Sequence, residues 1–508
     1  MDAGELRHAR RFLGVWAGLI AFAFGVGGIL HAFGVLTIDH LPPLHAHFRV
    51  LTITLLPAGA FAAVAVAALP RLVLRGGFGR ALLLAYGCTL AWTVLLAVSA
   101  DGLAAPLARP TEYLAVLPAV GDDPLGWLAS FTERLPGYPT HVRGHPPLPV
   151  LALWGLARLG LAGPFAASVL VVAVACSATV AIGLVVRNLA GEGAARQVLP
   201  YLALAPSAVW IATSMDAFFA GIGAWGVALL VLAGQRAASP IPPGVAPGRP
   251  PSPLREPPLP RRSPRLPPPP PPPARPSPSP SPPPSPSPSS PAPVFLGVLY
   301  GLVAGILLGA LPYLSYGLVP YLLIPVAAAM VARVPRAAVT AALAGAAGVS
   351  AAFAAAGFLW PAGVLATHAE WAADPGAARP YWYFLVANMA VLALVTGPAT
   401  AAGLARFGPV TVAALARFSP VTAAGLTRFG PVTGAGSRWY GLKVLVGTAL
   451  VAVLALDVSG VTRGEVERIW IPYALWIGLA ASLAGGRRWL AAQALIGLLL
   501  QSLVLSPW

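Results

Sequence analysis

Charged residues are scarce in this chain. Asp, Glu, Lys and Arg make up only 9% of its 508 residues, 57% are hydrophobic, and the mean hydropathy is +0.77. A soluble domain has about 25% charged residues, so this composition excludes an ordinary soluble protein. Repeated apolar runs of about 17–25 residues fit helices that cross a ~30 Å hydrocarbon core, and they lack the alternation of an outer-membrane barrel. We predict an all-α, polytopic transmembrane helix bundle.

Lysine and cysteine are also rare. Lys443 is the only lysine, and this arginine preference together with the Ala, Gly and Pro excess is typical of a GC-rich bacterial genome. Cys88 and Cys176 both lie in apolar runs, which argues against a disulfide framework or a thiol nucleophile. The spacing His45-Ala46-His47 alone is weak support for zinc. We expect no metal site and no resident cofactor, and the sequence leaves a need for a divalent cation open.

The apolar runs predict about thirteen membrane spans and one shorter helix. The shorter helix is a half-helix at 147–161 that dips into the membrane. The predicted spans are 12–36, 51–70, 81–100, 163–186, 197–213, 215–233, 294–313, 317–333, 337–360, 383–404, 441–458, 472–484 and 489–506.

The distribution of charge predicts the orientation of the bundle. With the N-terminus inside, 24 of the 32 basic residues and only 4 of the 16 acids lie on the inner side. The positive-inside rule therefore accounts for the net charge of +16, and we expect no nucleic-acid partner. The charged segment Met1–Arg11 precedes an apolar run too long for a signal peptide, so we expect a membrane anchor. The predicted location is the plasma membrane.

A proline-rich tract divides the chain into two membrane halves, 1–237 and 294–508. The tract at 238–293 contains an unbroken proline run from Pro267 to Pro273, with six Arg and one Glu. Proline fixes φ and lacks a backbone N–H, so the tract favours extended polyproline II and packs no core. We expect a disordered cytoplasmic linker; the alternative is a docking site for a partner that binds proline motifs.

An eleven-residue repeat lies in a predicted inner loop at 405–437. Its units begin at Ala405, Ala416 and Thr427, and each contains Arg-Phe, then Gly or Ser, then Pro-Val-Thr. A proline in every unit argues against one continuous helix. The repeat fits a duplication in a tolerant loop; the alternative is a basic, aromatic surface that lies on anionic lipid headgroups.

The predicted outer side gathers the unusual polar residues. A loop at 101–149 is much longer than most other loops, and a long polar loop beside membrane spans is a place where a membrane enzyme keeps its chemistry. The candidate site residues of this loop and of three other outer segments are Asp101, Glu112, Tyr113, His141, Arg143, His145, Asp216, Arg379, Glu467 and Arg468.

The order of these parts resembles the GT-C superfamily of membrane glycosyltransferases, in its actinobacterial, mannosyltransferase-like members. Four features carry the resemblance: an acid after an early span (Asp101, then Glu112); a His-Pro-Pro-Leu segment at His145–Leu148; a Leu-Ala-Pro span that ends at Asp216; and a late Gly-Glu-Val-Glu-Arg-Ile-Trp segment at Gly464–Trp470. Residues 81–233 match well and 294–480 loosely. Two extra spans, the proline-rich insertion and a glycine after Asp101 depart from the family pattern.

The resemblance implies a sugar transferase that takes its sugar from a polyprenyl-phosphate donor. A carboxylate, Asp101 or Glu112, would take the proton of an acceptor hydroxyl on a glycan or lipid. The remaining candidate residues would bind the donor, where Arg and His offset the charge of the leaving phosphate. The sugar, mannose or another, and the acceptor are not fixed by the sequence.

Two other functions stay open at this point. One is a transporter or flippase for lipid-linked or small solutes, which would show a repeat between its halves and broken helices at the midplane. The other is a non-catalytic membrane scaffold that works through its proline-rich tract. The acids lie at the outer surface rather than within spans, which favours the transferase.

Overall fold

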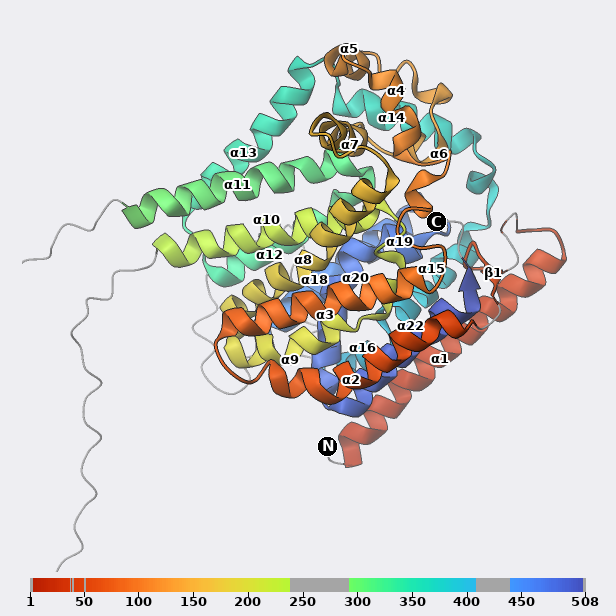
Figure 1. Cartoon of the computed structure of the whole chain (residues 1–508), viewed down its shortest axis with the longest axis vertical. Helices are drawn as coiled ribbons and strands as arrows, with labels where there is room; N and C mark the ends of the chain where they lie inside the picture. Colours follow the sequence, from red (N-terminus) through yellow and green to blue (C-terminus); the bar gives the residue numbers. More distant parts are fainter. Residues whose placement is uncertain are drawn as a thin grey trace, which may run out of the picture.

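The computed structural model describes residues 3–36, 38, 41–49, 52–237, 292–407 and 439–505. The predicted linker at 238–293 and the predicted repeats at 405–437 fall, apart from their ends, outside the described residues. The described residues comprise the two membrane halves and most of the segments that join their helices (Figure 1).

The described chain is an all-α membrane helix bundle, as predicted. Eight of its helices are long and apolar enough to cross a membrane. They are α1 (Ala3–Ala32), α2 (Leu56–Leu72), α3 (Phe78–Val98), α8 (Pro164–Ala190), α10 (Met215–Ala237), α11 (Ala292–Leu314), α13 (Arg336–Ala355) and α18 (Tyr440–Ser459). These eight agree with eight of the thirteen predicted spans.

A ninth span is broken. The run predicted at 383–404 folds as α15 (Tyr381–Thr396) and α16 (Pro398–Leu404), which meet at an angle of 103°. Gly397 lies at the break with φ 79°, where its missing side chain avoids a clash with Gln493. Proline at the first position of α16 suits a helix that starts anew, because its missing N–H has no intrahelical partner there.

Four predicted spans do not form single long helices in the described chain. The run at 197–213 divides into α9 (Glu192–Ala203) and a 3₁₀ turn, with prolines at Pro200 and Pro206. The runs at 317–333 and 472–484 are shorter apolar helices that end as α12 (Leu323–Ala332) and α21 (Ala481–Ala484). The run at 489–506 is α22 (Arg487–Leu503), an apolar helix of 17 residues. Among the described residues, eight or nine long spans therefore replace the predicted thirteen.

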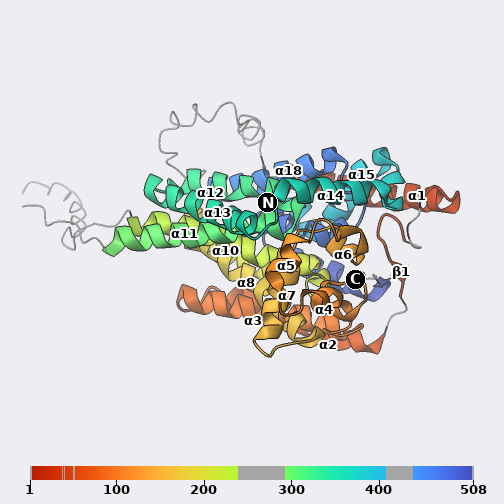
Figure 2. The ribbon, with the colours of Figure 1, turned by 90° about the horizontal axis from the view of Figure 1, so that it is seen from above.

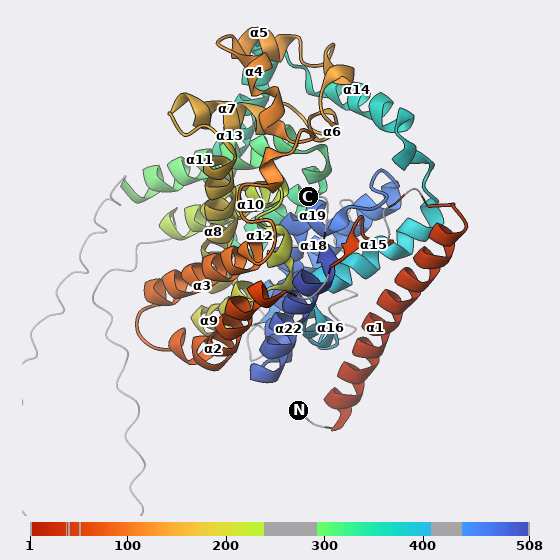
Figure 3. The ribbon, with the colours of Figure 1, turned by 45° about the vertical axis from the view of Figure 1, so that its right-hand side comes forward.

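The most enclosed of these eight spans is α10, which packs against α8 on one side and α11 on the other, with α13 beyond α11. In the most apolar stretch of α10, 72% of the residues are buried, against 11% in α1. Glycines allow close packing here, since a Cβ at Gly301 or Gly305 of α11 would collide with the backbone of α13. In contrast, α1 contacts mainly α15 and α16 and forms the edge of the bundle (Figure 3).

A folded cap of short helices occupies the loop between α3 and α8 (Figures 1 and 2). Its longest element is α7 (Leu148–Arg158), a short apolar helix within the half-helix predicted at 147–161. The other elements are 3₁₀ turns at Pro106–Ala108, Tyr113–Val116 and Leu135–Gly137, and the helices α4 (Leu117–Val120), α5 (Pro124–Ala129) and α6 (Thr140–Arg143). A helix that the sequence did not predict, α14 (Trp360–Ala373), contacts this cap at Leu135–Gly137.

A small sheet joins the segment after α1 to the end of the described chain. In it β1 (His47–Phe48) pairs antiparallel with β2 (Val504–Leu505), which follows α22. The end of α10 and the start of α11, between which the proline-rich tract lies in the sequence, are on the opposite side of the bundle, at the left of Figure 1.

Candidate active site

Three segments far apart in the sequence meet at the side chain of Arg468. This arginine lies in α19 (Val466–Ile469) and is 4% exposed. Its Nη1 donates to Asp216 Oδ2 at 3.0 Å, and its Nη2 donates to Glu465 Oε2 at 2.6 Å. The same Nη2 lies 3.3 Å from His141 Nε2. The guanidinium thus joins the cap, the start of α10 and the segment before α19.

Glu112 and His141 form a close pair within the cap. The distance between Glu112 Oε1 and His141 Nδ1 is 2.6 Å, and both side chains are buried. Residue 112 precedes the 3₁₀ turn at Tyr113–Val116, and the backbone N–H of His141 bonds the carbonyl of Thr111, which brings the two side chains together. The second carboxylate oxygen, Glu112 Oε2, is buried and accepts no hydrogen bond from any described residue.

His145 lies on the other side of the same cluster. Its Nδ1 is 2.8 Å from the carbonyl oxygen of His141, one helical turn earlier, and its Nε2 is 3.9 Å from Asp216 Oδ1. The ring packs edge-on against Tyr113, with ring centroids 5.8 Å apart. Ser214 Oγ donates to Asp216 Oδ2 at 2.5 Å and accepts from the Asp216 N–H, so it orients this carboxylate at the start of α10.

An unusual backbone presents Glu465 to Arg468. Glu465 has φ 62°, and Gly464 before it has φ 104°. A residue with a side chain rarely adopts the left-handed region, so the surroundings must hold it there. Reciprocal bonds supply that hold: Arg379 Nη1 donates to the Arg463 carbonyl at 2.8 Å, and Arg463 Nη1 donates to the Arg379 carbonyl at 3.0 Å.

A buried amide fixes the same segment from inside the bundle. Asn388 of α15 is 1% exposed, and its Nδ2 donates both to Asp457 Oδ1 and to the Thr462 carbonyl at 2.9 Å. Its Oδ1 accepts from the Gly464 N–H at 3.3 Å. One side chain therefore connects α15, the end of α18 and the segment that carries Glu465.

The cluster has strong mutual electrostatic effects. Burial raises the pKa of Glu465, but the charge of Arg468 and of its other neighbours lowers it by more, so the net pKa lies below the usual glutamate range. Burial lowers the pKa of Arg468, whereas Glu465 and Asp216 raise it above its ordinary value, so the guanidinium stays charged. Burial, followed by the charges of Asp216 and Glu112, raises the pKa of the Tyr113 phenol well above 10.0. The phenol therefore stays protonated.

The structure brings six of the ten predicted site residues into this cluster. They are Glu112, Tyr113, His141, His145, Asp216 and Arg468. Glu467 is buried in the same short helix as Arg468. Arg143 lies in α6 and pairs with Glu370 of α14 at 3.5 Å, both half-buried, while Arg379 holds the backbone of the Glu465 segment.

Asp101 is placed differently. Its carboxylate is 47% exposed and pairs with Arg109 at 3.4 Å, an exposed ion pair of the kind that contributes little. Among the described residues, it makes no hydrogen bond or ion pair with the cluster. Of the two carboxylates that the sequence offers as base, only Glu112 is therefore a member of the buried cluster.

Four residues of the site were not among the predicted ones: Ser214, Glu465, Asn388 and Asp457. One signal for Asn388 is present in the sequence, because it is an amide within the apolar run 383–404, and polar groups within spans are usually functional. Glu465 follows a glycine, but nothing in the sequence shows that its backbone is left-handed.

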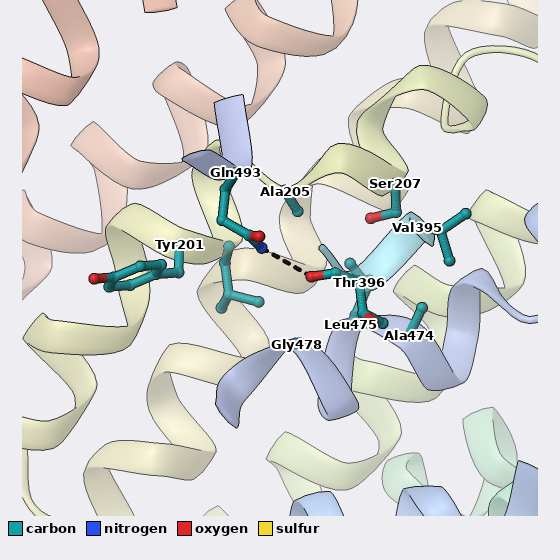
Figure 4. A pocket seen from close by; sticks show the side chains of 10 residues that line it. Tyr201, Ala205, Ser207, Val395, Thr396, Ala474, Leu475, Gly478 and Gln493 are labelled. Carbon is teal, nitrogen blue, oxygen red and sulfur yellow. Dashed lines mark hydrogen bonds between the residues drawn. The ribbon is translucent and has the colours of Figure 1, made fainter. Parts of the chain in front are cut away.

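A second polar feature lies at the break between α15 and α16. Gln493 of α22 donates from Nε2 to the Thr396 carbonyl at 2.8 Å (Figure 4). It also accepts from the Ala399 N–H at 3.2 Å, so its side chain satisfies the backbone on both sides of the break. The adjoining cavity, lined also by Tyr201, Ser207 and Gly478, measures about 10 Å³. That is at the lower limit for one water molecule, so it cannot hold a sugar or a lipid phosphate.

Within the described residues, no group of three or more His, Cys, Asp and Glu side chains is arranged to hold a metal ion. The arrangement offers instead a buried carboxylate with one uncommitted oxygen, a fixed guanidinium and two imidazoles. Comparisons with protein-family models, curated proteins and solved structures give no match to this chain.

Proposed function

We propose that this chain is an integral membrane glycosyltransferase of a bacterial plasma membrane. In this proposal it moves a sugar, with mannose as the first candidate, from a polyprenyl-phosphate donor to an acceptor hydroxyl on a glycan or lipid at the outer face. The observation that carries the proposal is the carboxylate of Glu112: it is buried, His141 holds one of its oxygens, and the other has no hydrogen-bond donor among the described residues.

The proposed role of Glu112 is that of the base. Attack of the acceptor oxygen on the anomeric carbon breaks the bond from that carbon to the phosphate oxygen, which keeps the electron pair. The hydroxyl proton passes to Glu112 Oε2, and the lipid leaves as a phosphate monoester. A positioned base of this kind contributes about 10²–10⁴-fold to the rate. The exposed position of Asp101 is why the proposal assigns this role to Glu112.

Cations near the cluster support a phosphate leaving group. Arg143 and Arg379 are half-buried rather than enclosed, so a phosphate could approach them from outside. Arg143 lies between His141 and His145 in the sequence, and Arg379 bonds the backbone of the segment that carries Glu465. Arg468 is fixed between two carboxylates. Asp216 stands in the first turn of α10, so the cluster lies at the end of a membrane span, where the phosphate of a membrane lipid is found.

A transporter or flippase is the second candidate, and one observation favours it. The break between α15 and α16 resembles the discontinuous helices of transporters. Against this, Gln493 hydrogen-bonds the backbone on both sides of the break, and the adjoining cavity has room for about one water molecule. The charged groups lie at the end of a span and not at this break, so we rank the transferase first.

The test uses purified full-length protein in lipid nanodiscs, radiolabelled polyprenyl-phosphate mannose and a crude pool of lipid and glycan acceptors. Wild type is compared with Glu112→Gln and Asp101→Asn. The matched control is Asp122→Asn, which removes an exposed carboxylate of the same cap. We expect transfer by wild type and control, and a loss of about 10²–10⁴-fold in turnover for Glu112→Gln.

Two results would contradict the proposal. Equal transfer by wild type and Glu112→Gln, with a loss in Asp101→Asn, would move the base to Asp101. Neither transfer nor donor binding by wild type would reject this donor, and a solute-uptake assay in proteoliposomes would then test the transporter.

A further inference from the structure

The two histidines of the cluster make different contacts although they lie one helical turn apart. His141 lies between Glu112 and Arg468, with Nδ1 toward the carboxylate and Nε2 toward the guanidinium. His145 has Nδ1 against a backbone carbonyl and Nε2 toward Asp216. The identities of these neighbours restrict where each ring can carry a proton, because a carbonyl or carboxylate accepts whereas a guanidinium only donates.

The tautomer of His141 follows from its two neighbours. The guanidinium of Arg468 has donors and no acceptor, so His141 Nε2 can bond it only through a lone pair. The ring proton must then be on Nδ1, where it meets Glu112 Oε1 at 2.6 Å. A second proton, on Nε2, would face the charged Arg468 N–H group directly and break this bond.

The charged and titratable groups around His141 come from three parts of the fold. Glu112 and Tyr113 belong to the cap, together with His145; Asp216 begins α10; Glu465 and Arg468 belong to the segment at α19. Asp216 and Glu465 are both bonded to Arg468, so their charge is directed at the guanidinium. Glu112 is the carboxylate that bonds His141 Nδ1.

We propose that His141 is a positioning residue, held as the neutral Nδ1–H tautomer, which transmits the fixed position of Arg468 to Glu112. Its N–H bond holds Glu112 Oε1 and thereby turns Oε2 toward the place of the acceptor hydroxyl. This deepens the proposed function, on which it rests, and replaces the sequence-based expectation that His141 is a cation for the donor phosphate. In this arrangement His145 is the imidazole whose Nε2 faces the carboxylate of Asp216.

Nitrogen NMR of the full chain in lipid, with ¹⁵N-labelled histidine, tests the tautomer without any substrate. The signals lost in His141→Asn identify this ring. We expect a protonated Nδ1 and an unprotonated Nε2 for it at about pH 8, where an ordinary imidazole is neutral and only its tautomer is in question. His368, which is exposed and stacks on Trp371, is the reference ring for an imidazole outside the cluster.

A protonated Nε2 on His141 at that pH would overturn the inference. Should His141→Asn fail to fold, Glu112→Gln provides the assignment, because it shifts the Nδ1 signal of the ring it touches. A wild type without transferase activity would reject the proposed function and leave this result standing, since the NMR experiment contains neither donor nor acceptor.

The transfer assay adds a rescue test. An asparagine amide places its N–H near the position of Nδ1, and a glutamine amide places it near Nε2. His141→Asn should therefore retain turnover, whereas His141→Gln should lose about 10²-fold or more, the effect of disabling the base. Equal loss in both variants would mean that the ring acts through packing or charge and not through its Nδ1–H bond.

Discussion

Arg468 and Asp216 are 252 residues apart in the sequence, and Arg468 Nη1 lies 3.0 Å from Asp216 Oδ2 with both side chains nearly inaccessible to solvent. This ion pair joins the two membrane halves at the start of α10. Removal of one partner from a buried pair leaves an unpaired charge in a poorly solvated place, which typically costs about 3–5 kcal/mol. The pair is therefore a test of how the halves are held together.

We expect Arg468→Met, which takes the cation from both Asp216 and Glu465, to lower the free energy of unfolding by about 3–5 kcal/mol. Asp216→Asn should cost less, because Arg468 keeps its bond to Glu465. The double variant should lose less than the sum of the two, because the charge of Asp216 is then not left without its cation. Denaturant unfolding in detergent micelles measures all three. The control is Asp101→Asn, which breaks the exposed Arg109 pair and should cost about 1 kcal/mol or less. Additive losses in the double variant would show that the two side chains are not coupled.

The sequence predicted the residue types of this site better than their arrangement. Glu112, His141, His145, Asp216 and Arg468 were recognisable because charges beside apolar spans need partners or a function. Their convergence was not, since it depends on how a cap of about fifty residues folds back over the end of α10. The sequence around a carboxylate at the end of a span, such as that of Asp101, does not show whether the side chain lies in the cluster or is exposed to solvent.

The described residues contain eight or nine long apolar spans where the sequence predicted thirteen, and the difference has a related reason. Hydropathy counts apolar residues, but whether a run becomes one long helix depends on its breaks. Pro200 and Pro206 divide one run, and Gly397 with Pro398 bends another by 103°. Such residues are visible in the sequence, whereas the partner that makes a break tolerable is not: Gln493, which satisfies the break at Gly397, comes from a helix near the other end of the chain.

The left-handed backbone before Glu465 makes a second prediction. Gly464 has φ 104°, and a Cβ there would lie 3.2 Å from Arg379 Nη1 and 3.3 Å from Phe384. Gly464→Ala should therefore lower the free energy of unfolding by about 1–3 kcal/mol. Gly478→Ala is the matched control, because Gly478 has a helical backbone and open space, and alanine there should be neutral or stabilising. Thermal unfolding of both variants measures the two changes in stability, and a loss in Gly464→Ala alone identifies position 464 as the strained one.

The pH dependence of stability follows from Glu465. Because Arg468 holds its folded-state pKa below the unfolded value, the charged carboxylate stabilises the fold above the unfolded pKa of about 4.3. This contribution is lost as the pH falls through the lower, folded pKa. We expect the melting temperature of wild type to fall below about pH 4.3, and Glu465→Gln to show a smaller fall from a lower starting value. Parallel curves for the two proteins, measured from pH 7 downward, would contradict this.

Asn388 makes a prediction about the segment that carries Glu465 and Arg468. Its three hydrogen bonds are to Asp457, the Thr462 carbonyl and the Gly464 N–H; the bonds to Asp457 and Gly464 are buried, and the bond to Thr462 is partly buried. Asn388→Ala removes the hydrogen-bond partner of these groups. A buried group left unsatisfied lowers the free energy of unfolding by about 1–3 kcal/mol. Asn188→Ala is the control, because Asn188 is a half-buried amide near the end of α8 and makes no side-chain hydrogen bond with any described residue.

Stability alone does not distinguish an anchor of the site from an ordinary core residue, so the transfer assay is measured on the same variants. If Asn388 positions Arg468, its loss loosens the contact between Arg468 and His141 and with it the orientation of Glu112. Turnover of Asn388→Ala should then fall by more than that of Gly464→Ala at equal remaining stability, because Asn388 holds both the backbone of this segment and the end of α18. Full turnover in the folded fraction of Asn388→Ala would mean that the segment keeps its position through the bonds between Arg379 and Arg463 alone.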